Sequence, residues 1–246
     1  MIITIDGKAC SCEKGEYLLE VAKRNGIFIP TFCYKAEICE RASCRVCIVE
    51  IETGGWRQVV TACVFPVERE MNVYTNSEKI KKQRKLILSL LLARAPESEQ
   101  IAKALELDGG SVSERFVRLD GEKCILCGLC TEACESVGSG AIGLAFRGTD
   151  KKVSSPYGSL PASCIGCGSC AAVCPTGAIG MTEDENTKTI WDKAFALVKC
   201  GRCGKAVGTR EEIEHAARKA GSEPAVLCED CRKKAMADVL AHTFGG

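Results

Sequence analysis

Several features that commonly point to a function are scarce or missing in this chain of 246 residues. Aromatic residues make up 5% of it, which argues against one large aromatic core, and there are only 2 histidines. The 33 basic and 32 acidic residues almost cancel, so no overall field attracts nucleic acid or a membrane surface. No apolar run approaches the ~18 residues that identify a membrane-spanning helix.

Export and nucleotide-binding signals are also lacking. The segment Met1–Gly7 has no basic region followed by an apolar run, so it does not look like a secretory signal. No Gly-x-Gly-x-x-Gly motif follows a strand and opens a helix, and no phosphate-binding lysine loop is present. We therefore expect a cytoplasmic chain with no membrane span, no nucleic-acid partner and no complete catalytic site of its own.

Cysteine, in contrast, is abundant, with 19 residues. A reducing cytoplasm disfavours disulfides, and an odd number of cysteines fits poorly with complete pairing. Small modules with few aromatic residues need stabilisation beyond a hydrophobic core, and bound metal can supply it. The composition therefore predicts that most of these thiolates hold metal.

One motif of four cysteines occurs twice in residues 115–185. It reads Cys-x2-Cys-x2-Cys-x3-Cys, from Cys124 to Cys134 and again from Cys164 to Cys174. A four-iron cubane needs one thiolate per iron, and in two-cluster ferredoxins the fourth cysteine of each run binds the other cluster. Two zinc sites are the alternative, but zinc motifs do not repeat this spacing. The predicted ligands of the two [4Fe-4S] clusters are Cys124, Cys127, Cys130 and Cys174 for the first, and Cys134, Cys164, Cys167 and Cys170 for the second.

Residues 1–78 offer a two-iron site in two registers. Cys39, Cys44 and Cys47 have the Cys-x4-Cys-x2-Cys spacing of plant-type ferredoxins. Cys33, Cys44 and Cys47 form a longer Cys-x10-Cys-x2-Cys pattern, which Cys63 completes. The spacing alone leaves both registers open.

The last part of the chain, residues 186–246, holds two further Cys-x2-Cys pairs. Four cysteines in paired knuckles suit tetrahedral zinc in a zinc-ribbon-like unit, and an additional iron–sulfur cluster is the alternative. A closed set of four thiolates indicates a structural role. The predicted metal ligands are Cys200, Cys203, Cys228 and Cys231. The leftover Cys10, Cys12 and Cys39 are expected to be small buried hydrophobic residues.

Local patterns predict helices and strands around these motifs. Asp6-Gly7 indicates a hairpin turn, and a helix follows from Glu16 to Asn25. Residues 79–114 read as a helical linker, and Arg210–Ala220 reads as a further helix. The first linker helix is expected to bury the apolar face formed by Leu86, Ile87, Leu90 and Leu91.

Three N-terminal segments carry a family resemblance. Ile29–Cys33, Ser43–Glu50 and Thr61–Cys63 resemble the N-terminal domain of an iron–sulfur subunit family. That family includes the large iron–sulfur subunit of respiratory complex I, NAD-linked [FeFe] hydrogenases, and the diaphorase iron–sulfur subunit of NAD-reducing hydrogenases. The resemblance implies a β-grasp ferredoxin domain, and a two-iron ligand set of Cys33, Cys44, Cys47 and Cys63, with Cys39 outside it.

The resemblance resumes at Lys123–Gly128 and extends to Cys174–Ala178, so it covers about residues 1–78 and 115–180. Family members usually carry a further cluster, held by one histidine and three cysteines, between these two regions. This chain has no cysteine or histidine between Cys63 and Cys124, so that cluster is missing. The departure leaves open how electrons cross from the two-iron site to the cubanes.

Together these patterns predict an α+β chain of four parts. The parts are a [2Fe-2S] β-grasp domain (1–78), a helical linker (79–114), a bacterial-type double [4Fe-4S] module (115–185) and the C-terminal four-cysteine unit (186–246). The resemblance implies an electron-transfer subunit between a flavin- and NAD(P)-binding subunit and a catalytic subunit such as a hydrogenase or formate dehydrogenase. An electron-bifurcating assembly is one version of this. A free polyferredoxin carrier and an iron–sulfur redox sensor are the alternatives.

Overall fold

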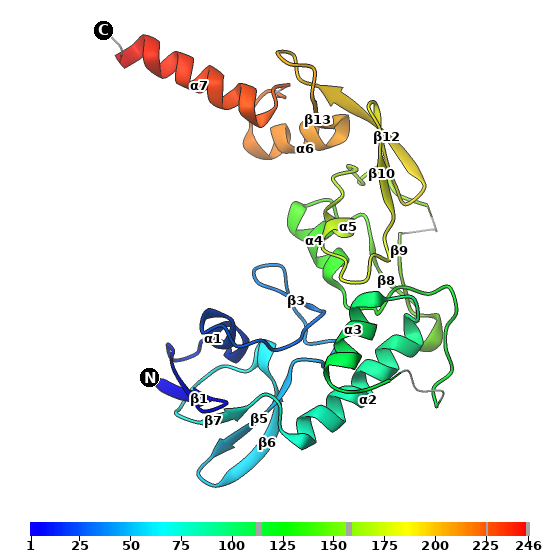
Figure 1. The fold of residues 1–246 in the computed structure, drawn as a ribbon. Coiled ribbons are helices and arrows are strands. Elements are labelled where there is room, and N and C mark those ends of the chain that lie inside the picture. The colour runs from blue at the N-terminus through cyan, green and yellow to red at the C-terminus, as the bar shows by residue number, and fades with distance from the viewer. Residues whose placement is uncertain (112–114, 156–158, 225, 245–246) are drawn as a thin grey trace. The chain divides into compact units, whose positions relative to one another are not determined.

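The computed structural model describes residues 1–111, 115–155, 159–224 and 226–244, without the side chains of 39, 40 and 241–244. The chain forms two compact units (Figure 1). The first unit comprises Met1–Ala133, Leu144–Val153 and Val173–Ala178. The second unit comprises Cys134–Gly143, Ser154–Ala172 and Ile179–Gly246. The chain is therefore a mixed α and β protein in which each unit contains part of the repeated cysteine motif.

A five-stranded sheet forms the N-terminal part of the first unit, in the order β2-β1-β7-β5-β6. Its strands are β1 (Ile2–Ile5), β2 (Lys8–Ser11), β5 (Ile48–Thr53), β6 (Trp56–Thr61) and β7 (Asn72–Tyr74). Strands β1 and β7 are parallel, and the other neighbours are antiparallel. The predicted hairpin turn is confirmed, because Asp6 (φ 46°) and Gly7 (φ 84°) connect β1 to β2 with the positive torsions of a tight turn.

Helix α1 (Leu18–Arg24) completes this core. Its buried residues Leu18, Leu19, Val21 and Ala22 join the sheet residues Ile3, Ile5 and Val49 in one hydrophobic cluster. Cys10 and Cys12 also belong to this cluster, as expected for small buried hydrophobic residues.

Two helices follow the sheet, α2 (Glu78–Arg94) and α3 (Glu99–Leu107). The hydroxyls of Ser77 and Ser98 accept hydrogen bonds from the third helical amides and cap the two N-termini. The predicted buried face of α2 is wrong in part. Leu86 and Leu90 are about half exposed, and the helix instead buries Ile80, Arg84, Leu88 and Leu92.

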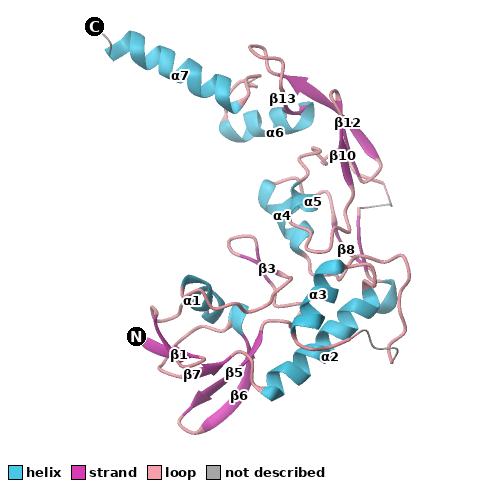
Figure 2. Cartoon of the chain, in the orientation of Figure 1, coloured by secondary structure: helices cyan, strands magenta, loops and turns pink. Residues whose placement is uncertain are grey.

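The second unit contains a four-stranded antiparallel sheet in sequential order (Figure 2). Its strands are β10 (Met181–Glu183), β11 (Thr187–Ile190), β12 (Lys193–Lys199) and β13 (Ala206–Thr209). Helix α6 (Arg210–Ala220) has its predicted bounds, because Thr209 caps its first turn and Gly221, at φ 60°, ends it. Helix α7 (Glu229–Phe244) follows. No described helix combines the length and apolar composition needed to cross a membrane.

Short elements hold the remaining cysteine loops. They are β3 (Tyr34–Lys35), β4 (Cys39–Glu40), the 3-10 turn Ala62–Val64, α4 (Leu129–Val137), β8 (Gly143–Ala145), the 3-10 turn Gly148–Asp150, β9 (Lys152–Ser154) and α5 (Ser169–Ala172).

Candidate metal centres

The structure brings four N-terminal cysteines together in the interior of the first unit. Cys33, Cys44, Cys47 and Cys63 are between 0% and 5% exposed. The amide of Cys44 donates a hydrogen bond of 3.3 Å to the Cys33 sulfur. A hydrogen bond from the Cys33 thiol lowers the pKa of Cys44 to about 6, and the Cys63 thiol lowers the pKa of Cys47. The pKa values of Cys33 and Cys63 are raised, first by hydrogen bonding to the same partners and then by burial.

These thiols form two pairs, Cys33 with Cys44 and Cys47 with Cys63. In each pair the pKa of one thiol is lowered and that of the other is raised, because a second buried negative charge is costly without a cation. Two irons would supply that cation, with one pair of thiolates for each, and thiolates are the ligands such a cluster takes. The donor set therefore fits a [2Fe-2S] cluster. The side chain of Cys39, the rival ligand, lies outside the described residues.

The buried Arg84 of α2 holds the backbone on both sides of Cys47. Its guanidinium donates to the carbonyls of Val46 (3.3 Å) and Ile48 (3.1 Å). It also donates to the carbonyl of Thr75 (2.7 Å) and forms an ion pair of 3.2 Å with Asp108. Arg84 is 1% exposed, so these contacts are made in the interior. No sequence pattern marked it, because an arginine on a helix is ordinarily solvated.

The cysteines predicted for the first cubane also lie in the first unit. Cys127 and Cys130 are buried, at 8% and 6% exposed. Burial raises the pKa of Cys124, and the nearby Cys174 thiol raises it further. Backbone amides already point at two of the sulfurs, from Leu126 to Cys124 (3.4 Å) and from Ala178 to Cys174 (3.2 Å). Such N–H···S contacts are typical of cluster loops, so the site fits a cubane.

The two-iron loop and the first cubane loop touch each other directly within the first unit. Gly128 has φ 83°, and a Cβ added there would lie 3.3 Å from the Arg41 guanidinium. Arg41 also forms an ion pair with Glu132 of α4. Beneath them Cys33, Cys44 and Cys127 belong to one hydrophobic cluster with residues of α2 and α3.

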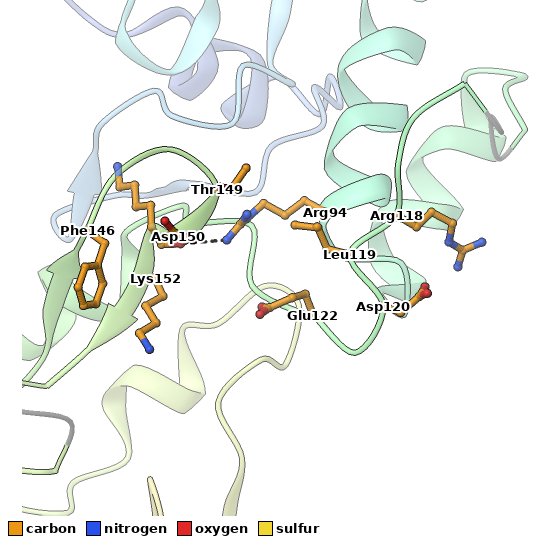
Figure 3. A pocket seen from close by; sticks show the side chains of 10 residues that line it. Arg94, Arg118, Leu119, Asp120, Glu122, Phe146, Thr149, Asp150 and Lys152 are labelled. Carbon is orange, nitrogen blue, oxygen red and sulfur yellow. Dashed lines mark hydrogen bonds between the residues drawn. The ribbon is translucent and has the colours of Figure 1, made fainter.

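A polar pocket adjoins the first cubane loop, and Arg94 at the end of α2 lines it. Figure 3 shows Arg94 reaching toward the segment of Thr149 and Asp150. Its guanidinium donates a hydrogen bond of 3.0 Å to the carbonyl of Lys151. Its positive charge also lowers the pKa of Cys124, although burial raises that pKa by more. The residues that line the pocket include basic and acidic side chains but no cysteine or histidine. The lining therefore offers no thiolate or imidazole ligand.

The cysteines predicted for the second cubane lie together in the second unit. Cys134, Cys164, Cys167 and Cys170 line one cavity, although Cys134 comes from the other copy of the motif. The amide of Ala141 donates to the Cys134 sulfur at 3.2 Å. Burial raises the pKa values of Cys164 and Cys170, which disfavours free thiolates there. The arrangement fits a cubane that takes its fourth ligand from the distant run.

The sheet of the second unit packs against this cubane loop. A Cβ added to Gly166 would lie 2.6 Å from the ring of Phe195, and one on Gly168 would lie 2.7 Å from the Met181 sulfur. The hydroxyl of Thr209 donates to the carbonyl of Ile165. These close approaches leave no room for a side chain at Gly166 or Gly168 of the second run. In the first run, Leu126 occupies the position that corresponds to Gly166.

Four C-terminal cysteines form a third site. The sulfurs of Cys200, Cys203, Cys228 and Cys231 all lie within 4.8 Å of one another. Backbone amides, first that of Cys228, lower the pKa of Cys200 to about 6. Burial, followed by hydrogen bonds from the neighbouring thiols, raises the pKa of Cys231 to about 12. Four sulfurs at this spacing fit one tetrahedral metal ion, and the set leaves no open position.

Three family models match parts of this chain. Residues 1–78 match a family of 2Fe-2S iron-sulfur cluster binding domains, and residues 117–181 match a family of 4Fe-4S dicluster domains. A second 4Fe-4S dicluster family matches residues 163–209. The chain thus contains one two-iron domain and a four-iron dicluster domain, together with a four-cysteine site near its end.

Several curated relatives are larger oxidoreductase subunits. An NADH-quinone oxidoreductase subunit of Rhizobium meliloti is 34% identical over 82% of this chain and 26% of its own length. The NADP-reducing hydrogenase subunit HndD of Solidesulfovibrio fructosivorans is 35% identical over 80% of this chain and 38% of its own length. The chain therefore spans only about a quarter to two-fifths of these relatives.

One solved structure has a similar fold. It is the crystal structure of an NAD+-reducing [NiFe]-hydrogenase in the H2-reduced state, with a TM-score of 0.60. The match covers 72% of this chain and 85% of the hydrogenase chain at 24% identity.

Proposed function

We propose that this chain, which belongs to the iron–sulfur subunit family of NAD(P)-linked hydrogenases and respiratory complex I, relays electrons inside a multi-subunit oxidoreductase. It would receive electrons from one partner and pass them to another through its clusters. The chemistry at either end would belong to the partners, because every cysteine set described above is closed.

We assign the clusters to the ligand sets that the sequence predicts. The two-iron cluster takes Cys33, Cys44, Cys47 and Cys63 in a β-grasp domain. The two cubanes take Cys124, Cys127, Cys130 and Cys174, and Cys134, Cys164, Cys167 and Cys170. The C-terminal set takes zinc in a structural role, since four thiolates in two knuckles suit tetrahedral Zn²⁺.

The direct contact between the two-iron loop and the first cubane loop is the observation that supports this proposal most. Arg41 lies against Gly128 and pairs with Glu132. Cys33 and Cys127 belong to one buried hydrophobic cluster. This contact supports a direct electron route between the two sites, one that would need no histidine-bearing cluster between them.

The partners we propose are a flavin- and NAD(P)-binding subunit and a catalytic subunit of the hydrogenase or formate dehydrogenase type. Relatives with these names support that choice: one is an NADP-reducing hydrogenase subunit, and another is a putative formate dehydrogenase from Staphylococcus haemolyticus. A free ferredoxin carrier would instead present a docking surface of one sign, and the net charge of +1 gives no such bias.

The test is anaerobic purification of the chain from its own host, followed by metal analysis and identification of co-purifying subunits. We expect about ten irons per chain, from one two-iron and two four-iron clusters, and about one zinc. We expect the chain to co-purify in a stable complex with a flavoprotein. Purification as a lone, iron-loaded chain would favour the carrier, and a colourless chain without sulfide would remove the basis of the proposal.

Paired variants test the two-iron ligands. Cys33→Ser should abolish or strongly alter the EPR signal of the two-iron cluster, whereas Cys39→Ser should leave it unchanged. Loss of the signal in Cys39→Ser alone would move the site to the shorter register.

A further inference from the structure

The turn between β11 and β12 contains two non-glycine residues in the left-handed backbone conformation. Ile190 pairs with Lys193, so Trp191 and Asp192 form a two-residue turn with φ values of 52° and 62°. Turns of this kind favour asparagine and glycine, because positive φ brings a Cβ too close to the backbone. A tryptophan here costs free energy, and a strained position that persists often serves a site.

The strained turn lies at the second cubane site. Trp191 lines the same cavity as Cys134, Cys164, Cys167 and Cys170. Its indole nitrogen is buried, and no described residue accepts a hydrogen bond from it at ordinary distance and angle.

The packing around the turn holds it in this position. The buried Ile190 lines the cavity beside Trp191, and the buried Phe195 of β12 occupies the space above Gly166. Lys193, on the same hairpin, lies over the Phe195 ring with its ammonium 4.7 Å from the ring centroid, so the tip also carries a positive charge. A buried N–H with no oxygen acceptor costs free energy unless a sulfur accepts it.

We propose that the indole N–H of Trp191 donates a hydrogen bond to sulfur at the second cubane, either a cysteine ligand or an adjacent sulfide, and thereby raises the reduction potential of that cluster. This inference rests on the proposed function, because it requires a cubane at these cysteines. Reduction adds one electron and therefore negative charge to the sulfurs, and the indole keeps its proton throughout. A donor stabilises the reduced form more than the oxidised form, which moves the potential upward.

The test compares Trp191→Phe with the matched control Trp56→Phe in the complete chain, purified anaerobically. Trp56 is the other tryptophan, 84% exposed on β6, so its replacement changes the same chemical group at a solvent-exposed position. Redox titration followed by EPR should show the equilibrium constant for reduction of one cubane falling about tenfold in Trp191→Phe, which is about 59 mV for one electron. The other clusters, and all clusters in Trp56→Phe, should keep their potentials.

A second readout uses isotope exchange of the indole proton. In D2O the exchangeable indole deuteron should give a hyperfine coupling to the reduced second cubane, and Trp191→Phe should abolish it. A Trp191→His variant, which retains a ring N–H, keeps the test decisive if the phenylalanine variant loses its cluster.

An intact second cubane with an unchanged potential and an unchanged deuteron coupling in Trp191→Phe would overturn this inference alone. A wild-type chain with fewer than two cubanes by iron, sulfide and EPR would overturn the proposed function as well. The two failures are therefore distinguishable.

Discussion

Replacing Arg84 with methionine gives a direct test of how the first unit holds its two-iron site. Arg84 donates to the carbonyls of Val46, Ile48 and Thr75 and pairs with Asp108, while being 1% exposed. Methionine replaces the aliphatic part of the arginine side chain but is shorter and donates nothing. The substitution therefore leaves three buried acceptors and one carboxylate without their donor.

The structure allows an estimate of the cost. A buried acceptor that loses its donor costs about 1–3 kcal/mol, so three carbonyls cost about 3 kcal/mol even at the lower end. The stranded carboxylate of Asp108, whose side chain is 9% exposed, adds to this. Packing of the methionine side chain offsets a part. We expect a loss of about 4 kcal/mol, within the ~3–5 kcal/mol typical of a broken buried ion pair.

The measurement is anaerobic urea titration, followed by the visible circular dichroism of the two-iron cluster. With a slope of about 2 kcal/mol per molar urea, the midpoint should fall by about 2 M in Arg84→Met. Lys82→Met is the matched control, because Lys82 is exposed on the same helix and carries the same charge. A shift in Arg84→Met no larger than in Lys82→Met would refute the reasoning that Arg84 anchors the backbone around Cys47.

Three further outcomes follow from the cysteine loops. Gly166→Ala should lose the second cubane but keep the first, because the added Cβ would lie 2.6 Å from Phe195 at a residue with φ 68°. Iron content and EPR would measure this loss, and two intact cubanes would contradict the prediction. Leu126 occupies the equivalent position of the first run, with φ 56°. Leu126→Gly should retain both cubanes and lower the free energy of unfolding by less than about 1 kcal/mol, because relief of backbone strain offsets the lost side chain. Loss of the first cubane would show that the Leu126 side chain is needed. Cys228→Ser should reduce zinc from about one to near zero per chain while iron stays constant; a parallel loss of about four irons instead would identify the C-terminal site as a cluster.

The sequence predicted those elements whose signals are local. The turn at Asp6-Gly7 follows from the backbone freedom of its residues, and α6 has its predicted bounds because a capping threonine and a terminating glycine flank it. The cysteine runs predicted iron–sulfur domains, and the matches over residues 1–78 and 117–181 confirm that assignment. The individual ligand sets remain predictions, and the two registers of the two-iron site differ only in which loop cysteine is used.

The buried face of α2 was outside the reach of sequence reasoning. Periodicity favoured Leu86 and Leu90, yet both are about half exposed and Arg84 is interior. The reason is tertiary: the carbonyls of Val46 and Ile48, the carbonyl of Thr75 and the carboxylate of Asp108 together stabilise a buried guanidinium, and they come from three separate segments. No window along one helix contains that information.

By itself, the amino-acid sequence determined which chemistry this protein can hold, because cluster-binding loops are short and their spacing is set by the size of the cluster. Only the tertiary structure decided what surrounds each site: that Arg41 lies against Gly128, that Phe195 fills the space above Gly166, and that Trp191 lines the cavity of a distant cysteine run. These contacts join residues far apart in the chain. They depend on side-chain packing and on the pairing of buried polar groups in the folded chain. Neither produces a periodic pattern in the sequence.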